Sequence, residues 1–437
     1  MKRTIAIILA ALLLPLASCA KGNAAQPTAA PSENAGVTAA PGETPAPASD
    51  PYEDYNNRFM IRGAAGGRIN WAETRDYLFF NRKYFDKQTG ECEFYCSKPE
   101  CTHSDETCEA NFGVLGIFKG KLYGTRAIPG GERRVGLYTQ NIDGSERKLI
   151  REIAYEEMGD MYFHRGKIYS FIKHGSVVNG APLQLFRLIL IDPYEKESRI
   201  LFENEEYPGG AGGWLFFRDN LAYLLIDYRA PQNAEEYPGC RIWELWTYDI
   251  EKDEMKLAST DHTLDGILHG CWITAEGDIY AIVEKDYEAE NDEDWRWYYS
   301  LAKLTNGKFE KLWDVEWIDG MGYDSQISDG TVVTQYCDNW INNPNVRFRV
   351  QDFDGAVLAD DYLPFPDLGE GAMDFDFERY EVVWSDGECL WLRFFLEKRI
   401  VYEDHTASQR MILAVKYVII DRGYSLAFTE PSGSFDF

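Results

Sequence analysis

The sequence predicts an all-β fold, a β-propeller of seven four-stranded blades, from three observations. From Tyr52 onward, short aromatic and β-branched runs are separated by Gly, Asn and Asp, and no long stretch has the 3.6-residue period of a helix. A strand pattern recurs every 46 to 57 residues, close to the usual length of a propeller blade. Each copy has room for four strands. Six or eight blades also fit, because the first copy is incomplete, and tandem β-sandwiches are the alternative fold.

The second strand of each predicted blade begins with a short motif, for which Gly120-Lys121-Leu122-Tyr123 is the clearest copy. A third strand follows and ends in a polar turn such as Asp143-Gly144 or Asn306-Gly307, residues that suit the positive φ angles of tight hairpins. A compressed early copy runs from Tyr77 to Gly90. The other motifs are Gly166–Tyr169, Asn220–Tyr223 and Gly277–Tyr280, with looser copies at Gly330 and Gly387.

The predicted connections between second and third strands are long, whereas those between third and fourth strands are short. Because antiparallel strands alternate in direction, the long connections all leave one edge of the ring, the edge at which the chain also passes to the next blade. Elaboration of one edge is typical of a ligand-binding face, although drift in unconstrained loops produces the same pattern. The long connections cover residues 174–184, 228–240, 284–296, 338–345 and 398–409.

Residues 1–18 have the organisation of an export signal. Lys2 and Arg3 precede an apolar stretch from Ile5 to Leu16, which is too short to span a bilayer comfortably. The segment Leu16-Ala17-Ser18-Cys19 resembles the lipobox of bacterial lipoproteins, in which the signal is cut before a diacylated cysteine. The resemblance implies that Cys19 carries lipid and attaches the chain to a membrane. An ordinary signal peptide with a chance cysteine is the alternative.

Residues 19–50 are predicted to form a disordered tether between the lipid and a propeller domain at residues 51–437. Residues 20–50 contain ten Ala and five Pro and no aromatic residue, so this segment cannot bury much apolar surface. The export signal and the lipobox together predict an extracytoplasmic location, at the cell surface or in the periplasm.

The charge balance excludes some partners. Lys and Arg number 44 and Asp and Glu number 72, which gives a formal net charge of −28. Nucleic acid is not expected as a partner, because phosphate binding needs clustered Lys and Arg. The acidic stretch from Asp286 to Asp294 lacks the residue order of a calcium loop, so we interpret it as a solvated face and do not expect calcium.

A cysteine and histidine cluster occupies 17 residues, from Cys92 to Cys108. Exported proteins reach oxidising surroundings, so the four cysteines are candidates for two disulfides, with Cys92 included. The other interpretation is one structural zinc ion held by three cysteines and a histidine. The candidate zinc ligands are Cys96, Cys101, His103 and Cys108.

A resemblance to a known family rests on these residues. The lipobox, the Ala- and Pro-rich tether, the segment Cys96-Ser97-Lys98-Pro99-Glu100-Cys101-Thr102-His103 and the propeller-like repeats together resemble uncharacterised lipoproteins of clostridial and related gut bacteria. The likeness covers the whole chain in organisation but only residues 96–108 in specific motif. The family implies no activity.

Aromatic residues on the long connections are candidate binding residues. Rings stack on the apolar faces of sugars and also dominate protein interfaces, although packing between strands is the more ordinary role of such residues. They are Tyr228 and Tyr237 in one connection, Tyr287, Trp295 and Trp297 in the next, and Trp340 in a third.

These observations favour a binding or sensor module for a glycan or a surface protein. No histidine has the spacing of a catalytic triad or of a catalytic metal motif, so an enzyme is not indicated. The alternative function is a carbohydrate-active hydrolase or lyase that uses carboxylates in the central pocket, since a sequence cannot show which carboxylates converge from different blades.

Overall fold

The computed structural model describes residues 71–73, 76–80, 83–86, 89, 91–101, 108–111, 113–128, 135–178, 181–274, 276–287, 296–319, 321–338, 343–366, 375–401, 406–427 and 434–436. The chain divides into two units, Met1–Ala48 and Ser49–Phe437, and every described residue belongs to the second. The predicted signal, Cys19 and the tether up to residue 50 lie outside the described residues. No helix in the described part of the chain is long and apolar enough to cross a membrane.

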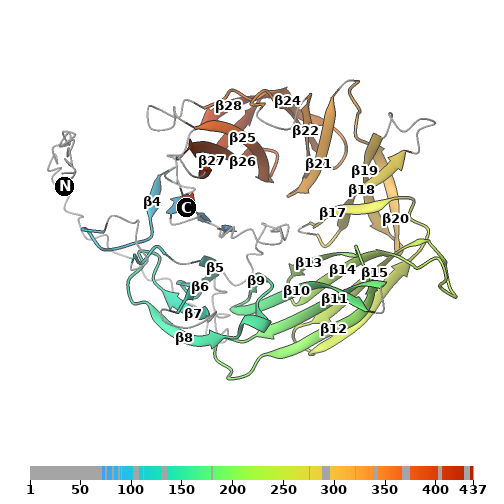
Figure 1. The fold of residues 1–437 in the computed structure, drawn as a ribbon, viewed down its shortest axis with the longest axis horizontal. Helices are drawn as coiled ribbons and strands as arrows, with labels where there is room; N and C mark the ends of the chain where they lie inside the picture. Colours follow the sequence, from blue (N-terminus) through green and yellow to red (C-terminus); the bar gives the residue numbers. More distant parts are fainter. Residues whose placement is uncertain are drawn as a thin grey trace, which may run out of the picture. The chain divides into compact units, whose positions relative to one another are not determined.

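Seven antiparallel sheets stand in a ring, and each is built from four consecutive strands (Figure 1). The predicted seven-bladed propeller is confirmed, and the six-bladed, eight-bladed and tandem-sandwich alternatives are wrong. We name the strands of each blade a to d from the innermost outward. The compressed early copy is a complete blade with short strands. One short 3-10 helix, η1 (Tyr155–Glu157), lies between the second and third blades.

The strands of the first four blades are as follows. The first blade contains β1 (Trp71–Glu73), β2 (Tyr77–Phe80), β3 (Lys83–Asp86) and β4 (Cys92–Phe94), and the second contains β5 (Gly113–Phe118), β6 (Lys121–Ala127), β7 (Val135–Gln140) and β8 (Lys148–Ile153). The third contains β9 (Asp160–His164), β10 (Lys167–Val178), β11 (Ala181–Ile191) and β12 (Arg199–Pro208), and the fourth contains β13 (Gly212–Arg218), β14 (Leu221–Arg229), β15 (Arg241–Asp249) and β16 (Glu254–Asp261).

The last three blades follow the same order. The fifth contains β17 (Ile267–Ile273), β18 (Ile279–Tyr287), β19 (Arg296–Thr305) and β20 (Lys308–Asp314), and the sixth contains β21 (Gly322–Ser328), β22 (Thr331–Cys337), β23 (Arg347–Asp352) and β24 (Val357–Tyr362). The seventh contains β25 (Asp376–Ser385), β26 (Cys389–Val401), β27 (Thr406–Ile420) and β28 (Gly423–Ala427), and β29 (Ser434–Asp436) pairs with β27 beyond β28.

The repeated sequence motifs mark the starts of the b strands and the c–d turns. Lys121 of the clearest motif begins β6. Asn306 and Gly307, between β19 and β20, have φ angles of 51° and 77°, which is the conformation of a two-residue hairpin turn. Asparagine tolerates this conformation better than most residues and glycine adopts it without strain, so the local sequence determines the turn.

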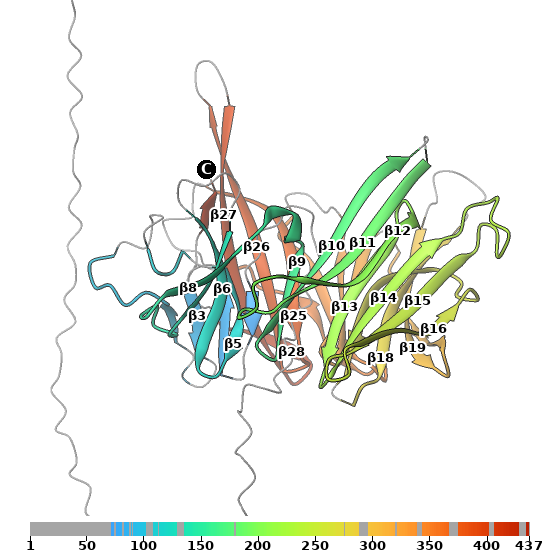
Figure 2. The same ribbon diagram turned by 90° about the horizontal axis from the view of Figure 1, so that it is seen from below.

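Two of the predicted long loops are instead strand. Residues 174–184 form most of a tight hairpin in which Gly175 pairs with Gln184 and Val178 pairs with Ala181. Residues 398–401 and 406–409 likewise continue β26 and β27, with Val401 opposite Thr406. The arms pair with each other and thereby satisfy their backbone groups. Both hairpins rise on the same side of the ring (Figure 2). This side carries the b–c connections, and we call it the elaborated edge.

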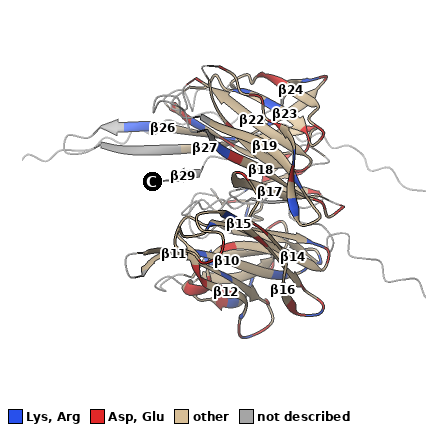
Figure 3. Ribbon diagram, turned by 90° about the vertical axis from the view of Figure 1, so that its right-hand side faces the viewer, with Lys and Arg blue, Asp and Glu red and all other residues tan. Residues whose placement is uncertain are grey.

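The core consists of apolar clusters that join neighbouring blades, including the first and the last. Leu78 and Phe85 of the first blade pack against Trp384 and Trp391 of the seventh, and the rings of Phe85 and Trp391 are 5.3 Å apart between centroids. We call this contact the seam. Among the described strands no backbone pairing crosses it. Acidic and basic residues are interspersed over the strands and turns (Figure 3).

Candidate functional site

Three cysteines of the predicted cluster converge between β4 and β5. The sulfur atoms of Cys96, Cys101 and Cys108 lie within 4.8 Å of one another. Cys108 is fully buried and the other two are partly buried. Three sulfur ligands at one point can hold a metal ion such as zinc. His103 lies outside the described residues, and Cys92 lies elsewhere, beside the seam.

Short backbone contacts hold this cysteine centre together. The Cys101 N–H donates to the Lys98 carbonyl at 3.1 Å, and the Ala110 N–H donates to the Cys108 sulfur at 3.3 Å. The Glu109 carboxylate accepts from the hydroxyl of Ser97 at 3.0 Å and from its N–H at 3.3 Å. These contacts close the segment on itself before it enters the second blade.

The centre packs against the c–d turn of the second blade. A side chain on Gly144 in that turn would meet the carbonyl oxygen of Tyr95 and the Cβ of Glu109. Arg147, just after the turn, donates to the Glu109 carbonyl. These contacts tie the connection between the first and second blades to the c–d turn of the second blade.

The thiols of Cys96 and Cys108 differ in their tendency to ionise. Burial raises the pKa of Cys108 to about 12. Burial also acts to raise the pKa of Cys96, but hydrogen bonds from the backbone N–H groups of Lys98 and Glu109 outweigh it and lower the pKa. A thiolate is the form that binds metal, and the lowered pKa favours it at Cys96.

A second polar group bridges the fifth and sixth blades. Nδ1 of His269 on β17 lies 2.9 Å from Glu284 on β18, and its Nε2 lies 3.0 Å from Asp324 on β21. Gln335 donates to Asp324 at 3.4 Å. The Tyr299 hydroxyl donates to Glu284, and burial together with the charges of Asp324 and Glu284 raises the pKa of Tyr299.

The position of His269 results from a bulge in β17. The ladder with β18 shifts between Leu268 and Gly270, so His269 is the extra residue, and a bulge of this kind redirects a side chain. The fully buried carboxylate of Asp227 accepts the Leu268 N–H at 2.9 Å and also binds Arg241. Burial raises the pKa of Asp227 despite these bonds. His269 and Asp324 are each the third residue of an a strand, near the elaborated edge.

The chemistry of this imidazole follows from its two contacts. A neutral imidazole carries one N–H, so its other nitrogen would face a carboxylate with a lone pair. A protonated imidazole would instead donate to both carboxylates. The ring also fills the space between Glu284 and Asp324, where a glycoside hydrolase with a pair of carboxylates needs room for the sugar and the water.

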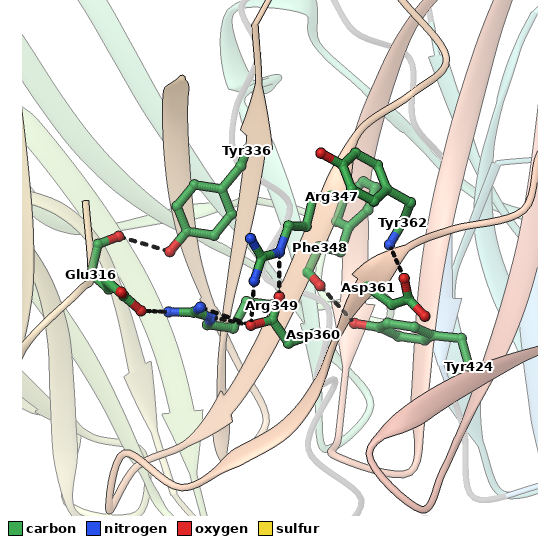
Figure 4. A network of polar contacts seen from close by, with 9 residues as sticks. All are labelled: Glu316, Tyr336, Arg347, Phe348, Arg349, Asp360, Asp361, Tyr362 and Tyr424. Carbon is green, nitrogen blue, oxygen red and sulfur yellow. Dashed lines mark hydrogen bonds and ion pairs between the residues drawn. The ribbon is translucent and has the colours of Figure 1, made fainter. Parts of the chain in front are cut away.

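A third network, in the sixth blade and the connection that precedes it, pairs its charged groups with one another (Figure 4). Arg347 and Arg349 of β23 both donate to Asp360 of β24, at 2.6 to 2.8 Å. Arg349 also pairs with Glu316, and the Tyr336 hydroxyl donates to the Glu316 carbonyl at 2.8 Å. These groups satisfy one another, so we assign them a structural role.

The predicted aromatic binding residues are in different environments. Tyr237 and Trp297 are 44% and 47% exposed at the elaborated edge. Tyr228 lies within β14, where its hydroxyl donates to Glu244 at 3.0 Å and its ring packs on Tyr207. Tyr287 ends β18, but its side chain is outside the described part. Trp295 and Trp340 lie outside the described residues.

Sequence reasoning missed the group formed by His269, Glu284 and Asp324. Its members come from three strands, and a spacing within one segment cannot reveal them. One signal was present, because His269 and Asp324 are 55 residues apart, which is one blade repeat. Equivalent positions in consecutive blades lie side by side in a propeller.

Comparison with known proteins identifies similar folds only. No family model matches the chain, and no curated protein matches it. Among solved structures, an ulvan lyase matches with a TM-score of 0.43 and 9% identity over 86% of this chain and 97% of the lyase. An oligogalacturonate lyase in complex with manganese matches with a TM-score of 0.34 and 12% identity over 80% of this chain and 96% of that one. An α-L-arabinofuranosidase from Fusarium graminearum has a TM-score of 0.34 and 10% identity over 69% of this chain and 91% of its own.

Proposed function

We propose that this protein is a lipid-anchored extracytoplasmic propeller that binds a ligand at its elaborated edge. A glycan is the leading candidate for this ligand, and a surface protein is the second. One observation carries the proposal. The β10–β11 and β26–β27 hairpins extend from the same edge (Figure 2), and the exposed rings of Tyr237 and Trp297 lie at that edge. Exposed aromatic residues beside polar groups are typical of binding surfaces.

Binding is favoured over hydrolysis because the carboxylates that meet between the fifth and sixth blades near this edge are already engaged. Glu284 and Asp324 both contact His269, and the ring separates them. A hydrolase would need a carboxyl pair open to the sugar. The lipid anchor rests on the lipobox at Leu16–Cys19, and a Cys19→Ser variant should lose fatty-acid labelling and leave the membrane fraction.

The ligand is tested with an array of glycans and cell-wall fragments, together with crosslinking on intact cells to capture protein partners. We expect selective binding to a glycan class, and Trp297→Ala should weaken it by about tenfold, the scale of a hot-spot truncation. Tyr362→Ala, which removes an exposed ring from an outer strand, is the matched control. Absence of any glycan or protein partner would contradict the proposal, whereas capture of a protein alone would change the ligand class.

The cysteine centre is proposed to hold one structural zinc ion, with His103 as the fourth ligand beside Cys96, Cys101 and Cys108. The convergence of three sulfur atoms supports this proposal. Purified protein should contain about one zinc per chain, and Cys101→Ser should lower the zinc content and the melting temperature together. Metal-free protein with its cysteines joined as disulfides would contradict it.

A further inference from the structure

Two stacked rings at the elaborated edge of the fourth blade have a geometry that packing alone does not explain. Tyr237 belongs to the b–c connection between β14 and β15, and His262 to the connection between β16 and β17, which leaves from the same edge. Their ring centroids are 3.7 Å apart and their planes differ by 21°. Both residues are exposed, so the stack presents a flat aromatic surface to solvent.

The backbone holds Tyr237 in an unfavourable conformation. Its φ angle is +52°, in the left-handed region that bulky residues rarely adopt, and the following residue, Pro238, further restricts it. Pro238 and Gly239 occupy the centre of a turn closed by the Cys240 N–H, which donates to the Tyr237 carbonyl at 3.0 Å. The Ala230 N–H donates to the Cys240 carbonyl at 2.8 Å and closes the loop. The strain is therefore maintained by an ordered loop.

Burial does not offset this strain, because Tyr237 remains 44% exposed. Backbone strain that packing does not repay is concentrated at functional sites. Exposed polar side chains of the same loop, Gln232, Glu235 and Glu236, supply an amide and two carboxylates that can bond to hydroxyl groups. The two carboxylates disfavour an anionic ligand.

We propose that the stack of Tyr237 on His262 is a subsite for a neutral pyranose residue of a glycan. The inference rests on the proposed function and adds the position and the charge class of the ligand. The open face of the tyrosine ring would pack on the apolar face of the sugar, and Glu235, Glu236 and Gln232 would bond to its hydroxyls. A uronic acid residue would bring a second negative charge to the two glutamates.

The test uses calorimetric titration of the mature protein with three probes of matched length, a gluco-hexasaccharide, a manno-hexasaccharide and a hexagalacturonate. We expect at least one neutral probe to bind and the hexagalacturonate to bind at least about tenfold more weakly. Tyr237→Ala should weaken binding of the neutral probe by about tenfold or more. Tyr237→Phe, which keeps the ring, and Tyr362→Ala, which removes an exposed ring elsewhere, should stay within about threefold of the parent.

The outcomes separate this inference from the proposed function. If Tyr237→Ala binds like the parent while Trp297→Ala does not, the glycan lies elsewhere on the edge, and the subsite is wrong although the function stands. Tighter binding of hexagalacturonate than of either neutral probe also overturns the subsite and leaves glycan binding intact. If none of the three probes binds, the neutral-sugar subsite is wrong, and the glycan array and the cell crosslinking then decide the proposed function. Thermal unfolding of each variant checks that the loop change has not unfolded the blade.

Discussion

At the scale of single residues, Asp360 shows how this acidic protein uses its arginines. Two guanidinium groups from β23 converge on one carboxylate of β24, and Arg349 is only 8% exposed. Burial acts to raise the pKa of Asp360, but the hydrogen bonds from Arg347 and Arg349 outweigh it and hold the pKa below its ordinary value. A carboxyl with a lowered folded pKa stabilises the fold above its unfolded pKa, and this contribution is lost as the pH falls through the folded value.

Asp360→Asn should therefore lower the free energy of unfolding by about 2–3 kcal/mol at pH 7, because two arginines lose their shared anion. The difference from the parent should persist at pH 5 and shrink below about pH 3.9, where more than half of the unfolded carboxyl is protonated. Urea unfolding at pH 7, 5 and 3 measures it. Asp361→Asn is the control, because within the described part of the chain that exposed neighbour accepts only the Tyr362 N–H. An equal loss at pH 3 and pH 7 would contradict the explanation.

At the scale of elements, the bulge in β17 turns a strand into a link between blades. Without the shift between Leu268 and Gly270, the ladder would continue in register, and the His269 side chain would take its place in the regular alternation between the two faces of the sheet. With it, the imidazole contacts one carboxylate in its own blade and one in the next. The same position of β5 and β25 is also irregular, yet those strands carry Leu115 and Glu378 there.

His269→Leu should lower the free energy of unfolding by about 2–3 kcal/mol, because Glu284 and Asp324 would lose the imidazole that bonds to both of them. His269→Gln should cost less, since an amide keeps a donor. His174→Leu, on the exposed arm of β10, is the matched control and should be nearly neutral. Chemical denaturation of the three variants measures the effect. A parent-like stability of His269→Leu would mean that the bridge contributes nothing to the fold.

At the scale of the whole molecule, the seam joins the two ends of the ring by side chains. Lys416 lies over both rings there, 5.4 Å from the centroid of Phe85 and 5.8 Å from that of Trp391. The first blade takes all its described strands from the start of the domain, and β29 extends the last blade only. Among the described strands, closure therefore depends on packing rather than on an exchanged strand.

Trp391→Ala should lower the free energy of unfolding by about 3–5 kcal/mol, the usual range for a buried tryptophan. It should also reduce cooperativity, so that the van't Hoff enthalpy falls below the calorimetric enthalpy. Trp297→Ala removes the same side chain at an exposed site and should do neither. Scanning calorimetry of both variants makes the comparison. Identical, fully cooperative transitions would show that the seam is not a weak point.

The predictable part of this protein is the part that repeats. Blade number followed from the spacing of motifs such as Gly120–Tyr123, because every blade needs the same turn and strand. The convergence of Cys96, Cys101 and Cys108 was predictable because they are close in sequence. The β10–β11 hairpin within 174–184 was not predictable, because exposed hairpin strands lack an apolar face and their sequence resembles that of a loop. The contacts of His269 with Glu284 and Asp324 were not predictable either, because they depend on a bulge and on a neighbouring blade.

The seam has a consequence for how chains meet at high concentration. Every other pair of neighbouring blades is joined directly by the chain, but the first and seventh blades are not. If the seam opens, the ring becomes an open arc whose two ends expose different apolar surfaces. One end carries Leu78 and Phe85 and the other carries Trp384 and Trp391. In a pair of open chains, the first blade of each chain can pack against the seventh blade of the other. Refolding at high protein concentration can therefore produce dimers in which the seam forms between two chains and every blade contact is native.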